Sequence, residues 1–590
     1  MQKDGTHQGD LRDSPAMAER RFYEFGRFSL DATGRVLSCE GRPVPLAPKI
    51  ADILLLLVEN AGNVVEKEEL LKKVWPHEFV EEGSLSRNIS VLRKALGDAA
   101  EGQEFIATIP KRGYRFTRKV QEILRASPAA GKTMLAVLPF ENLSERKSQE
   151  YLSDGLTEEM ITQLGKLNPE QLGVIARASA IRYKTTRKNV QQIGRELRVD
   201  YILEGSVRRA KSRVRITAEL VQVADQTHLW CESYDRDFSD ILGLQSDVAR
   251  SIAHAIKVKL IPPGRHQPSA ATIAPAAYQF YLKGRYLLNT RSHRALNESI
   301  RYYEQAIQID PACAVAYAGL ADSYLTLQDD GYLRTLEATA RARRAASRAL
   351  DIDETLAEPH ISLAHAYFHE FDWRAAEREF QRGIHLNPNN AFGHFYYSNY
   401  LAAMERFEEA LTQAKCAESL DPVSLSASTN TAALLYLSGN YDESIRHSLR
   451  FLDFEPHDAR AHEYLGRAYL EKQLIDQAIV AFRQAVEFAR DSPRCLASLA
   501  HAYAVAGRKN QAMALLADLR RLGKKAYVCP FLLALVEVGL GHKDQAFTLL
   551  DVAYEQRSTD LPFVKINPRL APLRADLRFH RLLQRLALAA

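Results

Sequence analysis

Hydrophobic and polar positions divide the chain into three regions with different periodicities. Residues 21–120 begin with strand-like alternation, continue with amphipathic helical stretches and end on another pair of strand-like stretches. Residues 133–260 interleave buried-strand runs with helices, and residues 277–590 are helical with a long-period repeat. The pattern therefore predicts a multidomain fold: an α+β domain, a small α/β domain and an all-α repeat solenoid.

The first region has the order strands, three helices, hairpin. Strands are expected at 28–30, 36–37 and 44–46, helices at 48–62, 66–74 and 84–96, and hairpin strands at 105–109 and 114–117. Ser84 is the expected N-cap of the third helix, and Gly97 follows its end.

The third helix has two distinct faces at 100° per residue. Its core-facing stripe consists of Leu85, Ile89, Leu92 and Leu96. The opposite face contains no acid and is centred on Arg87, Ser90, Val91 and Lys94, with Asn88 and Arg93 on its flanks. Such a helix can enter the major groove of duplex DNA, where hydrogen-bonding side chains read base edges.

Charge is polarised along this region. Residues 87–119 hold eight Lys or Arg and three acids, whereas residues 50–86 hold three Lys and eight acids. Because phosphate attraction supplies most sequence-independent affinity, the basic half is expected to face DNA, with the hairpin tip reaching the adjacent minor groove. The residues expected to contact DNA are Arg87, Asn88, Ser90, Val91, Arg93, Lys94, Lys111, Arg112, Tyr114 and Arg115.

These residues belong to a set that resembles the OmpR/PhoB-type winged-helix domain of transcription regulators. The set comprises residues 25–28, Leu46, Pro48, 70–75, Val80, Ser84, Leu85, 89–96 and 106–116. The resemblance implies that residues 84–96 are the recognition helix and residues 111–115 the wing. It also implies that residues 75–83 form a loop that can touch RNA polymerase.

Most members of that family carry a phosphoacceptor receiver domain ahead of the winged helix. Only residues 1–20 precede it here, so we expect no receiver, and the chain resembles the one-component CadC/ToxR/HilA-like branch. CadC- and ToxR-like members have a membrane span, but apolar runs such as residues 53–58 are far shorter than the ~20 residues a span needs. We therefore expect a cytoplasmic protein that does not contact a membrane.

The middle region resembles the TolB amino-terminal-like module through residues 136–144, 154–159 and 201–209. That module also follows the catalytic domain of some class III adenylate cyclases, and the resemblance implies a small α/β domain without catalytic residues. Asp154, Glu158 and Glu159 are expected at a helix start, where acids interact favourably with the helix dipole. Phosphate-loop, dinucleotide and zinc-protease motifs are missing, so we predict no enzyme and no cofactor.

The third region carries a 34-residue period. Pro388, Pro422 and Pro456 are spaced by it, and small and aromatic residues recur within each unit. Two matching sets are Leu363, Ala364, Tyr367, Ala376 and Phe380, and Leu465, Gly466, Tyr469, Ala478 and Phe482. This pattern is typical of tetratricopeptide repeats, of which we expect seven to eight, stacked around a groove for a protein or peptide.

Residues with metal-binding chemistry also occur in the repeats. His360, His365 and His369 have helical spacing, and Asp372 follows them. We interpret these histidines as part of a repeat-helix surface and predict no metal ligand. The aromatic residues Phe392, Phe395, Tyr396, Tyr397 and Tyr400 are interpreted mainly as packing between helices.

Composition places the domain boundaries in polar or Pro-rich segments. Residues 1–20 are expected to be disordered, residues 121–132 and 261–276 to be linkers, and the repeats to end in a C-terminal cap.

The leading hypothesis is a sequence-specific, DNA-binding transcription regulator whose repeats bind protein or sense a signal. The expected partners are duplex DNA, RNA polymerase through residues 75–83, a protein or peptide in the repeat groove, and a second copy of the chain. The alternative is a repeat scaffold whose winged helix binds protein. A third hypothesis, an enzyme within residues 133–260, has the least support.

Overall fold

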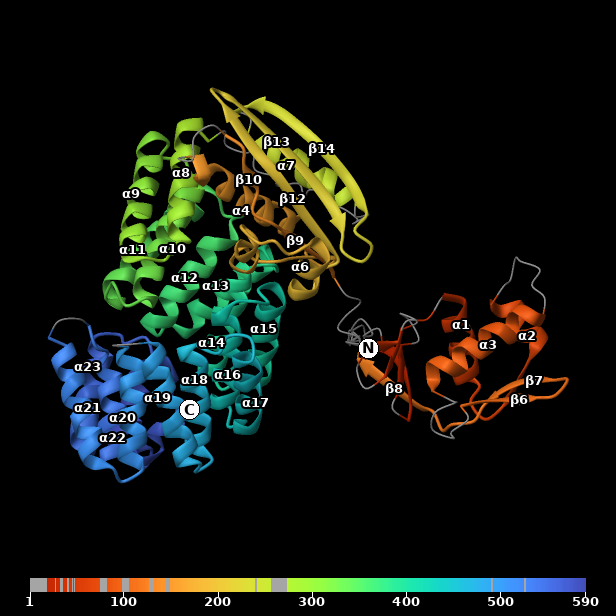
Figure 1. The fold of residues 1–590 in the computed structure, drawn as a ribbon. Helices are drawn as coiled ribbons and strands as arrows, with labels where there is room; N and C mark the ends of the chain where they lie inside the picture. The colour runs from red at the N-terminus through yellow and green to blue at the C-terminus, as the bar shows by residue number, and fades with distance from the viewer. Residues whose placement is uncertain are drawn as a thin grey trace, which may run out of the picture. The chain divides into compact units, whose positions relative to one another are not determined.

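The computed structural model divides into two compact units, Met1–Lys132 and Thr133–Ala590 (Figure 1). It describes residues 19–26, 28–31, 36–39, 42–44, 46, 48–74, 82–97, 105–126, 132–144, 149–238, 241–255, 273–489, 492–524 and 527–589. Residues 1–18 of the segment 1–20 that was expected to be disordered, most of the 75–83 loop and most of the second expected linker lie outside these described residues. Glu19 and Arg20 begin the first strand, so the expectation of disorder is wrong for these two residues.

The first unit contains two antiparallel sheets and three helices. Its elements are β1 (Glu19–Phe25), β2 (Phe28–Asp31), β3 (Val36–Cys39), β4 (Arg42–Val44), α1 (Pro48–Glu59), β5 (Val64–Glu66), α2 (Lys67–Val74), α3 (Glu82–Leu96), β6 (Ile106–Ile109), β7 (Gly113–Phe116) and β8 (Gln121–Ala126). One sheet has the order β4-β3-β2-β1-β8 and the other β5-β7-β6. The expected order of strands, three helices and hairpin is confirmed.

Two further predicted boundaries in this unit are wrong. Residues 121–126 were expected to begin a linker, but they form β8, which pairs with β1 from Glu19↔Ala126 to Glu24↔Gln121. A pairing between the two ends of the unit leaves no local sequence signal. Helix α3 begins at Glu82, so Ser84 lies inside its first turn and is not its N-cap.

Four phenylalanines join the two sheets of the first unit. Phe25 and Phe28 come from the first sheet, and Phe105 and Phe116 flank the β6–β7 hairpin. The ring centroids of Phe25 and Phe116 are 5.0 Å apart, and those of Phe28 and Phe105 are 5.6 Å apart, both in edge-to-face geometry. This buried cluster fixes the base of the hairpin against the rest of the unit.

The second unit opens with a mixed α/β layer. Its elements are β9 (Thr133–Val137), β10 (Glu141–Asn142), α4 (Glu150–Leu167), β11 (Leu172–Val174), α5 (Arg177–Ala180), η2 (Ile181–Tyr183), α6 (Val190–Leu197), β12 (Tyr201–Ala210), β13 (Arg213–Gln222), β14 (His228–Asp237) and α7 (Ile241–Ala255). The sheet order is β11-β9-β12-β13-β14, with β10 beside β12. Strands β9, β11 and β12 run parallel, whereas β12, β13 and β14 are antiparallel.

Alternate residues of this sheet enter two different cores. Leu135 and Leu203 pack with α4 and α7, whereas Ala136 and Ile202 pack with α6 on the other face. Asp154 was expected at a helix start, but α4 begins at Glu150 and buries Asp154 in its second turn. Its carboxylate accepts from the Lys184 Nζ at 2.6 Å and lies 3.5 Å from the Arg177 Nη2. Ion pairs therefore accompany the burial of this acid.

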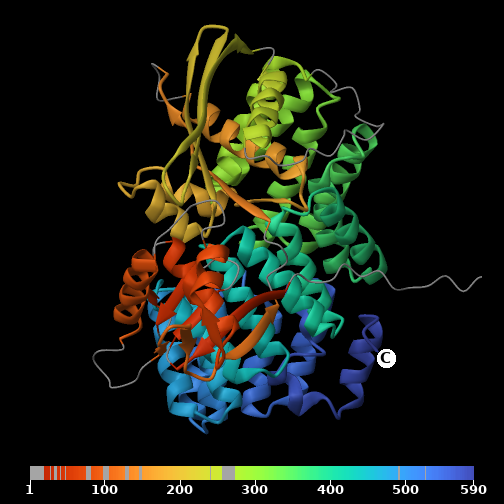
Figure 2. The same cartoon turned by 90° about the vertical axis from the view of Figure 1, so that its right-hand side faces the viewer.

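The helices that follow form eight antiparallel pairs within the described residues (Figure 2). They are α8 (Pro275–Leu288), α9 (His293–Ile309), α10 (Ala314–Asp329), α11 (Thr335–Ile352), α12 (Ala357–Glu370), α13 (Trp373–Leu386), α14 (Ala391–Ala403), α15 (Phe407–Leu420), α16 (Leu425–Leu437), α17 (Tyr441–Leu452), α18 (Ala459–Glu471), α19 (Ile475–Phe488), α20 (Pro493–Val505), α21 (Lys509–Leu522), α22 (Pro530–Leu540) and α23 (Lys543–Glu555). A Cβ on Gly466 would lie 2.9 Å from the Phe482 ring, which explains the small residue at the point where paired helices touch. The predicted fold class is confirmed.

The α/β layer and the repeats share a continuous buried interface. Asn389, two residues before α14, donates two hydrogen bonds of 2.9 Å to the carbonyls of Gly165 and Leu172. Ser179 donates to the Asp421 carboxylate at 2.5 Å, and both side chains are buried. The layer therefore belongs to the same compact unit as the repeats.

The C-terminal segment folds back along the first helices of the repeat pairs. It comprises η4 (Leu561–Phe563), η5 (Pro568–Leu573) and α24 (Leu577–Arg585). The Asp560 carboxylate forms a two-pronged ion pair with Arg494 on α20, with both N–O distances 2.9 Å. The Phe563 ring packs against Phe368 on α12, and Trp373 Nε1 donates to the Leu586 carbonyl at 2.8 Å. The expected cap thus also covers part of the face where repeat proteins usually bind peptides.

We predict that Asn389→Asp loosens the junction between the α/β layer and the repeats. The substitution replaces an amide donor with a carboxylate facing two buried carbonyls, which costs about 3 kcal/mol of unfolding free energy. Hydrogen-exchange mass spectrometry of the full chain should show faster exchange in α4 and β11. Asn297→Asp, on the exposed side of α9, is the matched control and should leave these peptides unchanged. Equal protection in both variants would contradict the inferred role of Asn389.

We predict that Gly113→Ala disrupts the contact between β5 and β7. A Cβ at this position would lie 2.0 Å from the Val65 carbonyl oxygen, so the strands must separate, at a cost of about 2 kcal/mol. Faster hydrogen exchange in β5 and β7 is the measurement. Gly83→Ala, in the first turn of α3 with open space around its Cβ, should instead stabilise the unit by about 0.5–1 kcal/mol.

Candidate nucleic-acid interface

The burial of one side of α3 determines which of its residues form the candidate interface. Leu85, Ile89, Leu92 and Leu96 are each at most 1% exposed and pack into the core of the first unit. This stripe is the one that helical periodicity predicts. Because it fixes the rotation of α3 about its axis, the opposite face must point to solvent.

The opposite face of α3 is exposed, polar and cationic. Arg87, Ser90 and Lys94 are exposed, and Val91 keeps 44% of its surface in solvent. Asn88 is half-buried on the flank. An exposed apolar side chain among polar ones suits contact with a thymine methyl group.

Two further hydroxyl residues extend this face towards the start of α3. Ser84 and Ser86 are both exposed. Our sequence-based prediction assigned Ser84 to the N-cap and did not consider Ser86. Helical spacing of three residues from Arg87 and four from Ser90 would have included both.

The wing is the β6–β7 hairpin. Lys111, Arg112 and Arg115 are exposed, and Lys111 adopts a positive φ of 62° in the turn. Glu66↔Gly113 and Val64↔Arg115 pairing joins β7 to β5. The hairpin thereby presents three cations from a paired three-stranded sheet.

Arg93 lies between α3 and the wing. Its Nε and Nη2 donate to the Ile106 carbonyl at 3.1 and 2.6 Å, and Nη2 also donates to the Thr108 hydroxyl at 2.8 Å. The guanidinium therefore joins α3 to β6. Its position in the structure is that of a residue that orients the helix.

Tyr114 differs from the other predicted contact residues because it is buried. Its ring is 5% exposed within the core, and its hydroxyl lies 3.3 Å from the Ser86 hydroxyl. The alternation along β7 explains this placement, since Tyr114 and Phe116 point inward and Arg115 points outward. Direct contact with DNA through the Tyr114 ring does not fit this burial.

The histidines of the repeats also lie elsewhere than expected. His365 and His369 were expected on a helix surface, but they are 3% and 5% exposed on α12. Helix α12 is the first helix of its pair and lies between α10 and α14, so its side chains are covered. Asp372 is the N-cap of α13, where it accepts from the Ala375 amide.

No helix among the residues that the structure describes combines the length and the apolar character needed to cross a membrane.

Three family models match the chain. Residues 41–116 match "Transcriptional regulatory protein, C terminal", residues 131–250 match "HilA/YgeH-like transcriptional regulator, second domain", and residues 459–492 match "Tetratricopeptide repeat".

Curated relatives match different shares of the chain. Transcriptional regulator HilA of Salmonella typhimurium is 25% identical over 436 residues, which cover 73% of this chain and 76% of HilA. A Rhizobium meliloti protein named as an adenylate cyclase is 37% identical over 237 residues, 40% of each chain. Transcriptional activator CadC of Escherichia coli is 35% identical over 101 residues, 16% of this chain and 20% of CadC. The chain thus spans about three quarters of HilA but less than half of the other two relatives.

One solved structure is similar to a part of the chain. The DNA-binding domain of Escherichia coli CadC is 31% identical, with a TM-score of 0.17, and covers 18% of this chain and 100% of that domain. The residues matched by the transcription-regulator model include α3 and the wing. The chain therefore combines segments that match the DNA-binding domain of transcriptional regulators, the second domain of HilA-like regulators and a tetratricopeptide repeat.

Proposed function

We propose that the chain is a one-component regulator that docks α3 in the major groove of duplex DNA and the wing in the adjacent minor groove. The observation that carries this proposal is the acid-free polar face of α3, which the burial of Leu85, Ile89, Leu92 and Leu96 turns to solvent. The exposed wing cations Lys111, Arg112 and Arg115 extend the basic surface.

The side chains divide into two groups by the contacts their chemistry allows. Arg87, Ser90 and Val91, at the centre of the exposed face, contribute base contacts. Asn88, Lys94, Lys111, Arg112 and Arg115 contact phosphates or the minor groove. Arg93, bound to β6, acts mainly by positioning α3.

The second unit supplies interaction or signal input in this proposal. The repeats bind a protein partner, residues 75–83 contact RNA polymerase, and two copies bind tandem sites as a homodimer. Because residues 560–586 cover part of the face formed by the first helices, we expect the partner site elsewhere on the repeats. One open cleft of about 700 Å³ lies between the α10–α11 loop and α21–α22, with Tyr332, Arg334 and Tyr527 in its lining.

The likeness of residues 133–260 to the TolB amino-terminal-like module stays a prediction. The matching model is that of the HilA-type second domain, and one relative is named as an adenylate cyclase. A role of this layer in relaying a signal fits its buried contacts with the repeats.

We predict that Lys94→Ala and Arg112→Ala each weaken DNA binding by about tenfold at moderate salt. Removing one phosphate contact should also reduce the slope of log K against log[salt] by about 1. The measurement is fluorescence anisotropy of the full chain on DNA fragments that it selects from genomic DNA. Lys72→Ala removes an exposed cation from α2, in the acidic half, and is the matched control.

An unchanged slope in both wing and helix variants would overturn the docking proposal. Failure of the wild-type chain to retain any genomic fragment at low salt would instead favour the scaffold alternative.

We predict that a change at Arg93 lowers DNA affinity without changing its salt dependence, in contrast to Lys94→Ala and Arg112→Ala. Arg93→Lys keeps the charge but cannot reproduce the paired hydrogen bonds to Ile106 and Thr108, so the first unit should lose about 1–2 kcal/mol of unfolding free energy. DNA affinity should fall while the salt slope stays at the wild-type value. If Arg93→Lys instead binds DNA like the wild type and Arg93→Ala lowers the salt slope by about 1, Arg93 is a phosphate contact.

A further inference from the structure

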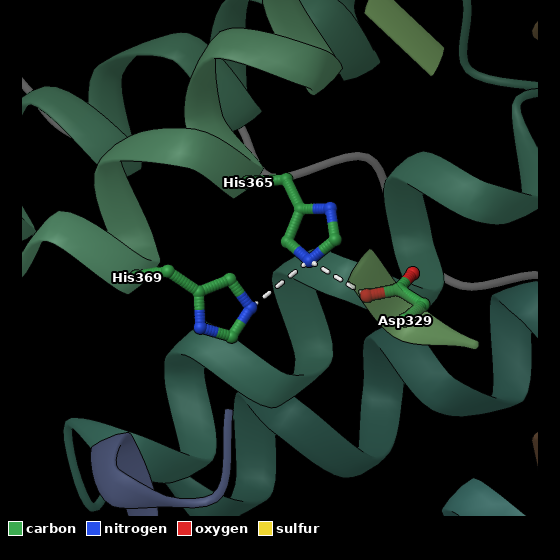
Figure 3. Close-up of side chains that lie close together, drawn as sticks. All are labelled: Asp329, His365 and His369. Atoms are coloured by element: carbon green, nitrogen blue, oxygen red, sulfur yellow. Dashed lines mark hydrogen bonds and ion pairs between the residues drawn. The ribbon is translucent and has the colours of Figure 1, made fainter. Parts of the chain in front are cut away.

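Two histidines and a carboxylate converge inside the repeat array. His365 and His369 are four residues apart on α12, and Asp329 is the last residue of α10 (Figure 3). The Nε2 atoms of the two histidines are 3.1 Å apart, and the His365 Nε2 lies 3.5 Å from the Asp329 Oδ1. One ligand atom from each residue lies within 4.8 Å of the others. Figure 3 shows both imidazoles pointing towards the same space.

These distances fit a shared metal ion. With metal–nitrogen and metal–oxygen bonds of about 2.0–2.1 Å, neighbouring ligands of a tetrahedral site are about 3.3 Å apart. The distances from the His365 Nε2 to the His369 Nε2 and to the Asp329 Oδ1 are already close to this length. The remaining distance, between His369 and Asp329, must shorten when an ion binds. A rotation of the Asp329 side chain allows this because that side chain is 23% exposed at the end of its helix.

Burial and contacts with Tyr396 favour metal binding by the three side chains. Both imidazoles are buried, and because burial disfavours the charged form, each can offer a lone pair. The Tyr396 hydroxyl donates to the Asp329 Oδ2 at 2.5 Å, which leaves Oδ1 facing the histidines. The Tyr396 ring also stacks on His365 with centroids 4.1 Å apart. Support of this kind is usual around metal ligands.

Hydrogen bonding alone satisfies the cluster incompletely. One proton on the His365 Nε2 can serve both the Asp329 carboxylate and the His369 Nε2, and the His369 imidazole must then carry its own proton on Nδ1. That buried Nδ1 atom has no hydrogen-bond partner among the described residues, whether or not a cation is bound at Nε2. A cation at the convergence point would replace the single shared proton and use the three facing lone pairs at once.

We propose that Asp329, His365 and His369 form a binding site for a divalent transition-metal ion, with zinc as its reference occupant. Imidazole ligands favour first-row transition metals, whereas magnesium and calcium prefer all-oxygen sites. Three protein ligands leave a coordination position for water or an exogenous ligand on the exposed side of Asp329. His360 is outside the site, since its Nδ1 lies 2.6 Å from the Glu379 carboxylate.

The test is titration of the full, EDTA-treated chain with Zn²⁺ by calorimetry and with Co²⁺ by absorption spectroscopy. We expect one ion per chain, with weak visible cobalt bands and without the strong near-ultraviolet bands of cobalt thiolates. The absence of cobalt–thiolate bands excludes binding by the exposed Cys231. Mg²⁺ should not compete.

The variants separate ligation from folding. His369→Gln should weaken binding at least 100-fold, and Asp329→Asn at least tenfold, while His360→Gln on the same helix should bind like the wild type. Zn²⁺ should raise the melting temperature of the wild type and of His360→Gln but not of His369→Gln. Asp329→Asn retains an acceptor for Tyr396, so it tests ligation even if His369→Gln unfolds. No binding below about 100 µM, or equal binding by wild type and Asp329→Asn, would overturn the proposal.

Discussion

The burial of one stripe of α3 is the constraint on which the DNA-binding surface depends. Leu85, Ile89, Leu92 and Leu96 are nearly inaccessible, and each would lose about 1.5–3 kcal/mol if turned to solvent. No competing rotation of the helix buries as much apolar surface, because its other face is polar. A separate cluster of Phe25, Phe28, Phe105 and Phe116 holds the hairpin. Arg93 connects α3 to the hairpin by binding the main chain of β6. Apolar packing thus orients both α3 and the hairpin, and the proposed docking uses the cations at their exposed surfaces.

Periodicity predicted those parts of the structure whose stabilising contacts are local or repeated. The buried stripe of α3 and the paired repeat helices follow directly from spacing within one helix or between equivalent units. Strand β8 was missed because its partner β1 lies about one hundred residues earlier in the chain. Strand β14 was missed because most of its residues are exposed on a sheet edge, so no apolar alternation marks it. Tyr114 was assigned to DNA from its neighbours in sequence, although strand alternation turns it into the core.

The second unit owes its compactness to contacts between segments far apart in sequence. Asn389 bonds to the end of α4 and to β11, Ser179 bonds to Asp421, and Asp560 bonds to Arg494. None of these polar residues is distinctive in sequence, and their partners are 66 to 242 residues away. Their burial makes each bond costly to break, since an unpaired partner would remain inside the protein. A change at the repeats can therefore reach the α/β layer through directly bonded groups. The same fold-back limits how far the classical repeat groove is open to a partner.

The histidine cluster shows how a repeat array can assemble a site that no single repeat contains. Sequence spacing correctly suggested that His365 and His369 share a helix face, but it offered His360 and Asp372 as companions, and both have other roles. The carboxylate comes instead from Asp329, at the end of the preceding first helix, because first helices of successive pairs lie side by side. Two imidazoles one turn apart set the edge of the site, and the repeat stacking sets the distance to the third ligand. An ion held there would bind α10 to α12 directly, so its occupancy would act on the stacking of neighbouring repeats and not on any one helix. Such a link lies in the same compact unit as the α/β layer, which makes the repeat stacking a physical route by which ligand binding could alter that layer.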